Sequence, residues 1–458
     1  MQETTREEII SIIQQQRNFF ATQQTKDVAF RIEQLKKLKK ILTDNEKAIA
    51  DALFADLHKS YEEAFLTEFS IVMNELNYHL KHIKKWSKPE KVKTPKHLLP
   101  SSSYIYHEPL GLSLIIAPWN YPYQLLINPL IGAISSGCCA VLKPSPDTSQ
   151  FEKLISNIIE NNFDKKYIAV AHGDKETNSV LLEQRFDFIF FTGSPRVGKI
   201  VMKAAAENLT AVVLELGGKS PCIVDKHANI PLAAKRIVFG KIINAGQTCI
   251  APDYIFAHQS VKNELIEYMK KYITEMLGGD TKQSKHYARI VNEKALKRLQ
   301  QLLLEGNIVI GGEVDEKEKY LAPTIIDNVQ TDFKIMQEEI FGPVFPILDF
   351  TNIDSVIEYI NTNEKPLALY YFGKNKNAQK VLSSTSSGGG CINDTLMHSA
   401  SNHLPFGGVG NSGLGKYHGK DTFLAFSNRK AVVQSSTSIE LPFKYAPYKS
   451  FKLTKKLV

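Results

Sequence analysis

Apolar residues along the first hundred positions recur with the period of an amphipathic helix. They fall on one helical face at Phe30, Ile32, Leu35, Leu38 and Ile41, and the same character continues over residues 53–79. Because each such helix has a single apolar face, we expect a helical layer that covers another part of the molecule.

From Leu112 the pattern changes to short β-rich apolar runs separated by helical stretches. Strands are predicted at 112–117, 139–142, 167–171, 187–191 and 211–216, and a second series at 254–257, 307–310, 344–348 and 367–372. Helices are predicted at 261–276 and 353–360. This alternation predicts two α/β domains in series with parallel, helix-covered sheets. The boundary is expected at Gly217 and Gly218, where the backbone can turn tightly.

Residues 109–142 form a stretch of 34 residues without a charged side chain. Its length would suffice to span a bilayer, but it is interrupted by Pro118, Asn120, Pro122, Gln124, Asn128 and Pro129. Lipid would leave the amides and the freed backbone groups without hydrogen bonds. We therefore expect a buried strand, turn, helix and strand, and no transmembrane segment.

Composition indicates a folded, soluble chain. Of 458 residues, 43% are apolar and 23% are charged, as in globular proteins. The five cysteines are scattered without paired ligand spacing, which argues against a disulfide scaffold or a zinc finger, and no metal site is expected. The amino terminus lacks the pattern of a signal peptide, so a reducing cytoplasm is the expected compartment.

The net charge of +8 comes from two lysine-rich stretches. Residues 81–96 hold seven lysines and one glutamate, and residues 441–458 hold five lysines and no acid. Because the rest of the chain is not basic, a nucleic-acid-binding face is excluded. Solvated lysines on a helix end and a tail are the simpler interpretation. The aromatic residues of the tail leave peripheral contact with an anionic membrane as a minority hypothesis.

Residues 190–199 join a predicted strand to a predicted helix. Ser194 can cap that helix and Pro195 suits its first position, and such a helix start favours phosphate binding. The spacing invites comparison with a P-loop, but Ile200 replaces the Ser or Thr that would bind magnesium. Nucleoside triphosphate hydrolysis is therefore disfavoured, and the motif alone leaves a plain turn open.

Three residues are candidates for chemistry. Glu215 is the only charge in residues 211–218 and, if desolvated, could serve as a general base with a raised pKa. Cys249 lies in a polar bend, whereas the other cysteines lie in or beside apolar runs, so it is the best nucleophile candidate. Asn120 follows a strand end and could donate to an oxyanion. Taken singly, a solvated acid, an inert thiol and a turn asparagine remain the alternatives.

Together, six ordered motifs closely resemble the aldehyde dehydrogenase superfamily. They are Ala-Pro-Trp-Asn-Tyr-Pro at 117–122, Lys-Pro-Ser at 143–145, Phe-Thr-Gly-Ser at 191–194, Leu-Glu-Leu-Gly-Gly-Lys at 214–219, Gly-Gln-Thr-Cys at 246–249 and Glu-Glu-Ile-Phe-Gly-Pro at 338–343. The match extends from about residue 20 to residue 430. The residues around Cys249 and at 404–413 resemble the class 3, fatty-aldehyde branch, in a soluble bacterial-type form.

The resemblance implies NAD(P)-dependent oxidation of an aldehyde to a carboxylic acid. Cys249 would attack the carbonyl, and the oxyanion of the thiohemiacetal would be held by the Asn120 side chain and the Cys249 amide. After hydride transfer, Glu215 would activate the water that hydrolyses the thioester, and Glu339 could share this work. The implied cofactor contacts are Pro118, Trp119, Lys143, Gly193, Ser194, Gly198, Glu339 and Phe341.

One departure from the family pattern concerns the cofactor. Many relatives have an acid after Lys-Pro-Ser that binds the adenosine ribose, whereas this chain has Pro146 followed by Asp147. Without that carboxylate, no negative charge at this position repels the 2′-phosphate of NADP. We therefore expect either NAD or NADP to serve as the cofactor.

The resemblance also implies an α/β fold with two Rossmann-like doubly wound domains and a small β oligomerisation arm. We expect residues 1–80 and 109–216 to form the NAD(P)-binding domain with its helical layer, and 217–400 the catalytic domain. Residues 81–108 and 401–458 would supply the arm and the C-terminal tail, with arm strands near 104–108 and 431–435. A homodimer is the expected assembly.

Two alternatives stay open. A coenzyme A-acylating dehydrogenase would capture the thioester with a thiol, although Glu215 argues against it, and a catalytically silent nucleotide-binding protein could share the fold. The resemblance suggests medium or long aliphatic, or aromatic, aldehydes. Tyr106, Tyr121, Phe239 and Ile250 suggest an apolar approach to the site, although their positions in the sequence place none of them in the pocket. No arginine lies near Cys249 in the sequence to bind a substrate carboxylate.

Overall fold

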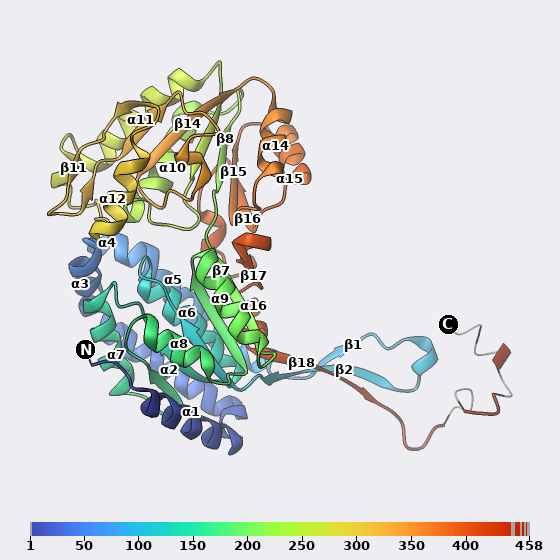
Figure 1. The fold of residues 1–458 in the computed structure, drawn as a ribbon. Helices are drawn as coiled ribbons and strands as arrows, with labels where there is room; N and C mark the ends of the chain where they lie inside the picture. Colours follow the sequence, from blue (N-terminus) through green and yellow to red (C-terminus); the bar gives the residue numbers. More distant parts are fainter. Residues whose placement is uncertain (1, 441–444, 449–450, 453–454, 456–458) are drawn as a thin grey trace.

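The computed structural model describes residues 2–440, 445–448, 451–452 and 455. Its elements form two α/β lobes and an extended arm (Figure 1). The predicted membrane contact of the basic tail, 441–458, falls largely outside the described residues. Among the described residues, no helix combines the length and apolar character needed to cross a bilayer.

An amino-terminal helical layer covers the first lobe. It contains α1 (Arg6–Ala21), α2 (Val28–Asp44), α3 (Glu46–Leu57), α4 (Tyr61–Ala64), a π-helical turn η2 (Phe65–Phe69) and α5 (Ser70–Trp86). The side chains of Thr5 and Asp27 cap α1 and α2. The apolar stripe of α2 is buried at Leu35, Leu38 and Ile41, and α2 and α5 pack against α6 (Pro122–Ser136). The predicted helical layer is confirmed.

The first sheet has the strand order β17-β7-β6-β3-β4-β5. Its strands are β3 (Leu112–Ile116), β4 (Cys139–Lys143), β5 (Ile168–Val170), β6 (Phe188–Gly193), β7 (Ala211–Leu216) and β17 (Gly413–Leu414). Strands β3 to β7 pair in parallel, and the helices between them are α6, α7 (Ser149–Glu160), α8 (Lys175–Glu183) and α9 (Pro195–Ala206). The uncharged stretch therefore folds as the predicted strand, turn, helix and strand.

The carboxyl-terminal segment returns to this sheet. Gly413 of β17 pairs antiparallel with Glu215 of β7, and α16 (Lys420–Ala425) packs on α6. Residues 401–458, expected to form arm and tail, thus also close one edge of the first sheet. A two-residue strand has no periodicity that a sequence pattern could reveal.

The second sheet has the order β10-β13-β14-β9-β8-β15-β16. Its strands are β8 (Pro221–Val224), β9 (Tyr254–His258), β10 (Asn307–Ile310), β13 (Thr324–Asp327), β14 (Val344–Phe350), β15 (Ala368–Phe372) and β16 (Gly389–Ile392), and β11 (Val314–Asp315) pairs with β12 (Tyr320–Leu321) as a separate ribbon. Strands β8, β13 and β16 were not predicted, because glycine or proline in or beside each weakens the strand pattern. The α/β fold class with two doubly wound sheets is confirmed.

Helices connect the strands of the second lobe. They are α10 (Ile230–Ile242), α11 (Lys262–Leu277), α12 (Glu293–Leu302), the short α13 (Lys334–Gln337), α14 (Ile353–Thr362) and α15 (Asn375–Ser384). The predicted helices at 261–276 and 353–360 correspond to α11 and α14, each within two residues.

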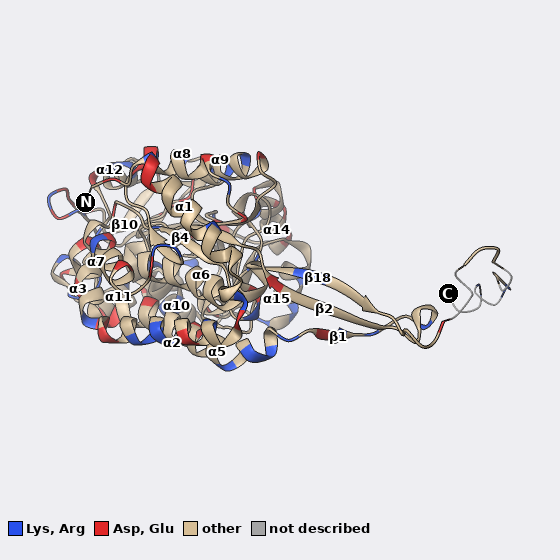
Figure 2. Ribbon diagram, turned by 90° about the horizontal axis from the view of Figure 1, so that it is seen from below, with Lys and Arg blue, Asp and Glu red and all other residues tan. Residues whose placement is uncertain are grey.

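Three antiparallel strands form the arm, in the order β1 (Glu90–Val92), β2 (Ser102–Pro109) and β18 (Ser427–Gln434). They extend away from the lobes, as Figure 2 shows. The seven lysines of residues 81–96 are all exposed at the end of α5 and along the arm, as expected for solvated lysines.

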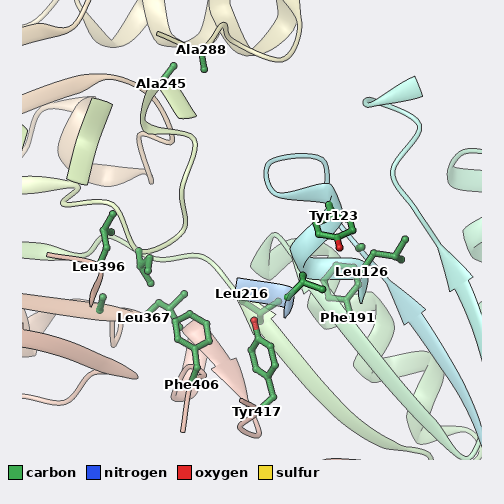
Figure 3. Packing of buried hydrophobic residues seen from close by; sticks show 14 of the residues in the cluster. Tyr123, Leu126, Phe191, Leu216, Ala245, Ala288, Leu367, Leu396, Phe406 and Tyr417 are labelled. Atoms are coloured by element: carbon green, nitrogen blue, oxygen red, sulfur yellow. The ribbon is translucent and has the colours of Figure 1, made fainter. Parts of the chain in front are cut away.

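Apolar side chains from both lobes meet at their junction. Leu216 of β7, Leu367 before β15, and Phe406 and Tyr417 of the carboxyl-terminal segment lie close together in Figure 3. The rings of Phe406 and Tyr417 are 5.6 Å apart, edge to face. This packing places the ends of the two sheets against one cavity.

Candidate active site

A strained bend presents Cys249. After α10, Asn244, Ala245 and Gly246 have φ values of 49°, 49° and 72°, a left-handed conformation that is costly for residues other than glycine. A Cβ atom at Gly246 would lie 2.3 Å from the carbonyl oxygen of Gly342. The bend is therefore pressed against the Glu-Glu-Ile-Phe-Gly-Pro motif of the second lobe.

Cys249 and Glu215 line the same cavity, which has a volume of about 350 Å³. Polar groups there include Tyr121 and Thr248, whose hydroxyls are 2.6 Å apart. The remaining wall is mainly apolar, with Leu66, Leu125, Phe239, Ile250, Leu396 and Met397. A thiol and a carboxylate thus share a largely apolar pocket.

Glu215 is 3% exposed at the carboxyl end of β7. Neither of its carboxylate oxygens has a hydrogen-bond partner among the described residues. Burial raises its pKa well above the usual range, and the ammonium group of Lys416 opposes this rise. The carboxyl group is therefore strongly basic once ionised, as a general base must be.

As a whole residue, Cys249 is partly buried, unlike Cys138, Cys139 and Cys222. Burial, Glu339 and Glu215 raise its pKa to about 12, whereas the backbone N–H groups of Cys249 and Ile250 lower it. The thiol is therefore protonated at neutral pH and needs a proton acceptor before it can attack. The other partly buried cysteine, Cys391, lies 3.5 Å from Nδ1 of His398, away from this cavity's lining.

Asn120 is buried in the loop after β3. Its Nδ2 donates to the carbonyl oxygen of Gln247 at 3.0 Å, and its own backbone carbonyl accepts from Nδ2 of Asn244 at 2.8 Å. A primary amide has two donor hydrogens, so one fixes the side chain while the second stays available. The structure brings Asn120 into direct contact with the Cys249 bend.

A second cavity has a volume of about 290 Å³. Its lining includes Pro195, Gly217, Gly218, Lys219 and Glu339. Ser194 caps α9 by accepting from the N–H of Val197 at 3.4 Å, and Pro195 is the first helical residue, which confirms that prediction. The helix start offers amide donors of the kind that bind phosphate.

Glu339 lines this second cavity. Burial and Asp253 raise its pKa to about 8, and the backbone N–H of Gly218 opposes the rise. The next aromatic residue, Phe341, has φ 50° and packs edge to face with Trp119, with ring centres 5.5 Å apart. Together they bring the second lobe against the loop that follows β3.

Most of the other predicted cofactor residues lie at the carboxyl ends of strands in the first sheet. Pro118 and Trp119 follow β3, Lys143 ends β4, and Gly193 and Ser194 follow the body of β6. Lys143 is 1% exposed, donates from Nζ to the oxygen of Pro144 at 2.8 Å, and has its pKa lowered by burial. Gly198 is buried in α9, where a Cβ would meet Leu216 at 2.6 Å. Doubly wound sheets bind dinucleotides at the carboxyl ends of their strands, so the residues fit such a group.

Comparison with known proteins agrees with the site geometry. The model of the aldehyde dehydrogenase family matches residues 1–432. The chain belongs to the aldehyde dehydrogenase family. It is 50% identical to the 4,4'-diaponeurosporen-aldehyde dehydrogenase of Staphylococcus aureus, over 95% of this chain and 96% of that protein. It is 43% identical to the mouse "Aldehyde dehydrogenase, dimeric NADP-preferring", over 93% and 95% of the two chains.

Among solved structures, the substrate-bound state of Staphylococcus aureus AldH superposes with a TM-score of 0.96 at 49% identity, covering 98% of this chain and 99% of that one. As a member of this family, the protein is an NAD(P)-dependent oxidoreductase that oxidises aldehydes. The resemblance to the superfamily and to its class 3 branch is confirmed.

Within this aldehyde dehydrogenase, three of the four aromatic or apolar residues expected along the approach line the Cys249 cavity, namely Tyr121, Phe239 and Ile250. The fourth, Tyr106, does not line it. It lies on β2 of the arm and is 39% exposed. Alternation of apolar residues could not separate an arm strand from a pocket wall.

Several lining residues were missed by sequence reasoning. Leu66 and Thr67 come from η2, Met397 follows β16, and Tyr417 and His418 precede α16. These segments lie far from Cys249 in sequence and carry no local signal. Only their packing at the junction of the lobes brings them to the site.

Proposed function

We propose that this enzyme oxidises apolar aldehydes to carboxylic acids through a covalent adduct on Cys249. The observation that carries the proposal is that Cys249 and Glu215 share one largely apolar cavity. A separate cavity is lined by Glu339 and by Gly217, which is two residues after Glu215. The substrate is proposed to occupy the Cys249 cavity and the cofactor the second one.

The roles of the residues follow from their surroundings. Cys249 transfers its proton to a carboxylate and attacks the aldehyde carbon, forming a thiohemiacetal. The second amide hydrogen of Asn120 and the N–H of Cys249 receive the oxyanion, and one such donor is worth about 3–4 kcal/mol of barrier. The bound nicotinamide supplies the hydride acceptor.

Glu215 is the proposed general base for hydrolysis of the resulting thioester. Its unpaired, desolvated carboxylate can take a proton from water as the water attacks the acyl carbon. Glu339, whose pKa is also raised by burial, is a second carboxylate that can share proton transfer. Cys249 then leaves as a thiolate and is ready for another cycle.

The cavity wall favours aldehydes with long or aromatic apolar parts. No lysine or arginine is among the described residues that line it, so a substrate carboxylate would find no partner. The Staphylococcus aureus relative is named a 4,4'-diaponeurosporen-aldehyde dehydrogenase. Medium or long aliphatic and aromatic aldehydes are the proposed class.

The proposed cofactor is NAD or NADP. Gly193, Ser194 and Gly198 would lie near its pyrophosphate, Lys143 and Glu339 would bind its riboses, and Phe341 would pack near its nicotinamide. Pro118 and Trp119 are further proposed contacts. Pro146 and Asp147 are exposed beside Ser145. Because the side chain of Pro146 is uncharged, it would not repel the 2′-phosphate of NADP. The mouse relative is named NADP-preferring.

The proposed assembly is a cytoplasmic homodimer. The arm projects β2 and β18 away from the lobes (Figure 2), with Tyr106 and Val433 exposed on it. The mouse relative is named as dimeric, and the five free cysteines fit a reducing compartment. The division into residues 1–80 with 109–216, 217–400, and 81–108 with 401–458 stays a proposal.

Mass spectrometry of enzyme quenched during turnover tests the proposed chemistry. An acyl group is expected on Cys249, and the free acid is expected as product with and without coenzyme A. A product that appears only as an acyl-coenzyme A would favour the acylating alternative. Cys249→Ser should abolish NAD(P)H formation, whereas Cys391→Ser, a matched change outside the cavity, should not.

A further inference from the structure

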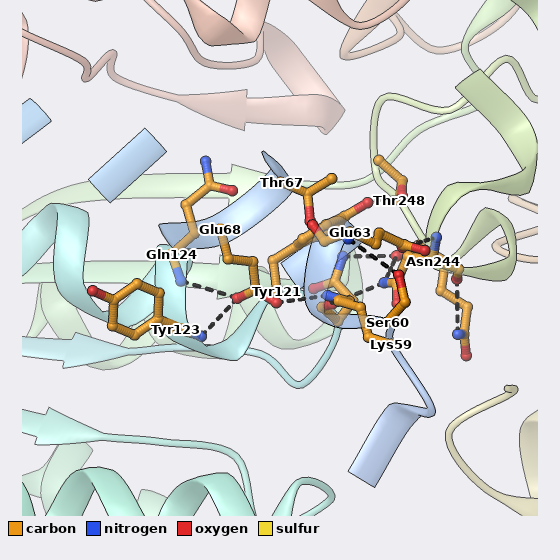
Figure 4. Close-up of polar contacts among 12 residues, drawn as sticks. Lys59, Ser60, Glu63, Thr67, Glu68, Tyr121, Tyr123, Gln124, Asn244 and Thr248 are labelled. Carbon is orange, nitrogen blue, oxygen red and sulfur yellow. Dashed lines mark hydrogen bonds and ion pairs between the residues drawn. The ribbon is translucent and has the colours of Figure 1, made fainter. Parts of the chain in front are cut away.

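A buried ionic network joins the amino-terminal layer to the active site (Figure 4). Lys59, between α3 and α4, donates from Nζ to Oε1 of Glu68 at 2.6 Å, and neither side chain is exposed. Glu68 lies in the π-helical turn η2, and such turns are frequent at functional sites. Neither residue lines the Cys249 cavity.

One branch of the network reaches the loop that carries Asn120. Nζ of Lys59 donates to the carbonyl oxygen of Asn120 at 3.3 Å and lies 4.3 Å from the ring centre of Tyr121. Oε2 of Glu68 accepts from the backbone N–H groups of Tyr123 and Gln124 at 2.9 and 3.2 Å. The pair thereby fixes both the loop and the start of α6.

A second branch reaches the bend that carries Cys249. Oε1 of Glu63, in α4, accepts from the backbone N–H of Asn244 at 2.6 Å. Asn244 is the first left-handed residue of that bend, and its Nδ2 donates to the backbone oxygen of Asn120. The backbone oxygen of Asn120 is therefore shared by Lys59 and Asn244, where the two branches meet.

Stability alone does not account for this arrangement. Burial of a lysine and a carboxylate costs more than burial of an apolar pair of similar volume, which is often as stable or more stable. Every side-chain hydrogen bond described for Lys59 and Glu68 ends on the other member of the pair or on backbone atoms of residues 120–124. The network acts on the backbone that holds the proposed oxyanion donor.

We propose that Lys59, Glu63 and Glu68 are positioning residues, which hold the Asn120 loop and the Cys249 bend in the geometry required for attack without touching the aldehyde. This inference rests on the proposed roles of Cys249 and Asn120. A displacement of about 1 Å at reacting groups can cost roughly a hundredfold in rate, so a small relaxation of either loop should be visible in kcat.

The first test replaces Lys59 by methionine, which keeps the length of the side chain and removes the ammonium group. Glu68 keeps its two backbone donors in K59M. We expect kcat to fall by roughly ten- to a hundredfold, with little change in the KM for an aldehyde such as decanal or in the dissociation constant for NADP. The alkylation of Cys249 by iodoacetamide, followed against pH, should also change its profile.

The second test compares Glu63→Gln with Glu63→Ala. Glutamine keeps an oxygen acceptor for the N–H of Asn244, so kcat should stay near that of the unmodified enzyme, whereas alanine should lower it. Glu62→Ala, at an exposed neighbour on α4, is the matched surface control and should leave kcat unchanged. If K59M does not fold, this pair decides the question.

Equal kcat values for K59M, Glu63→Ala and the unmodified enzyme would overturn the inference, even with a lower melting temperature, because that outcome is purely structural. Cys249→Ser separates this failure from failure of the proposed chemistry. Full activity in Cys249→Ser would refute the nucleophile. An inactive Cys249→Ser with a fully active K59M would refute only the positioning role.

Discussion

Nδ2 of Asn120 donates to the backbone oxygen of Gln247 at 3.0 Å, so the loop after β3 is bound to a residue two positions before Cys249. The side chain of Gln247 is itself fixed, since Nε2 donates to the oxygens of Asn244 and Arg289 and Oε1 accepts from the N–H of Val291. The first lobe thus meets a bend that the second lobe holds firmly.

Replacing Asn120 by aspartate should remove the oxyanion donor while keeping the shape of the side chain. We expect kcat to fall by about a hundred- to a thousandfold. Because a carboxylate would also face the oxygen of Gln247, the melting temperature should fall as well. Steady-state rates and thermal unfolding measure the two effects. Asn161→Asp, at an exposed helix end, should alter neither, and an active Asn120→Asp enzyme would contradict the assignment.

Glu215→Gln should make hydrolysis of the acyl-enzyme slow. We expect a burst of NAD(P)H of about one equivalent per site, followed by a steady rate lower by roughly a hundred- to ten-thousandfold. Rapid-quench or stopped-flow absorbance separates the two phases. If the steady rate stays normal, Glu339 or another group must supply the base.

The pH dependence follows from the same carboxyl group. Burial raises the pKa of Glu215 in the folded state, so the carboxylate form, and with it the hydrolysis rate, should increase as pH rises. The sign for stability is opposite. The folded state binds this proton more tightly than the unfolded state does. The protonated carboxyl group of Glu215 therefore contributes fully to the free energy of unfolding below its unfolded-state pKa, and this contribution is lost as pH rises through its folded-state pKa. Denaturant unfolding at several pH values measures the decrease in unfolding free energy as pH rises. This decrease should be smaller in Glu215→Gln.

Pro146→Glu should shift the enzyme toward NAD. A carboxylate beside Ser145 would repel a 2′-phosphate, so kcat/KM with NADP should fall by about tenfold or more relative to NAD. Pro146→Gln, which adds similar bulk without charge, is the control and should leave the ratio nearly unchanged. A native preference for NAD of more than about a thousandfold would contradict the proposed dual use.

Gly246→Ala should disrupt the Cys249 bend. Its φ is 72°, and an added Cβ would lie 2.3 Å from the oxygen of Gly342, so no side chain fits there. We expect a loss of about 1–3 kcal/mol in unfolding free energy, together with reduced kcat. Gly279→Ala, where a Cβ meets no atom within 4 Å, should leave both unchanged. A normal Gly246→Ala enzyme would show that the bend is not rigid.

The sequence by itself determined the parts of this protein whose physics is local. The strand, turn and helix around Asn120, the cap and first residue of α9, and the isolated acid at the end of β7 depend on periodicity, proline geometry and charge within a few residues. Their order along the chain also sufficed to indicate the family.

Tertiary structure alone decided which distant residues meet. The buried pair of Lys59 and Glu68, the contact of Glu63 with Asn244, and the place of Tyr417 in the cavity wall join segments that are far apart in sequence. A lysine between two helices looks solvated in a sequence, because the cost of burying its charge is offset only by partners that packing supplies. The same packing separated Tyr106, on the exposed arm, from the aromatic residues of the pocket.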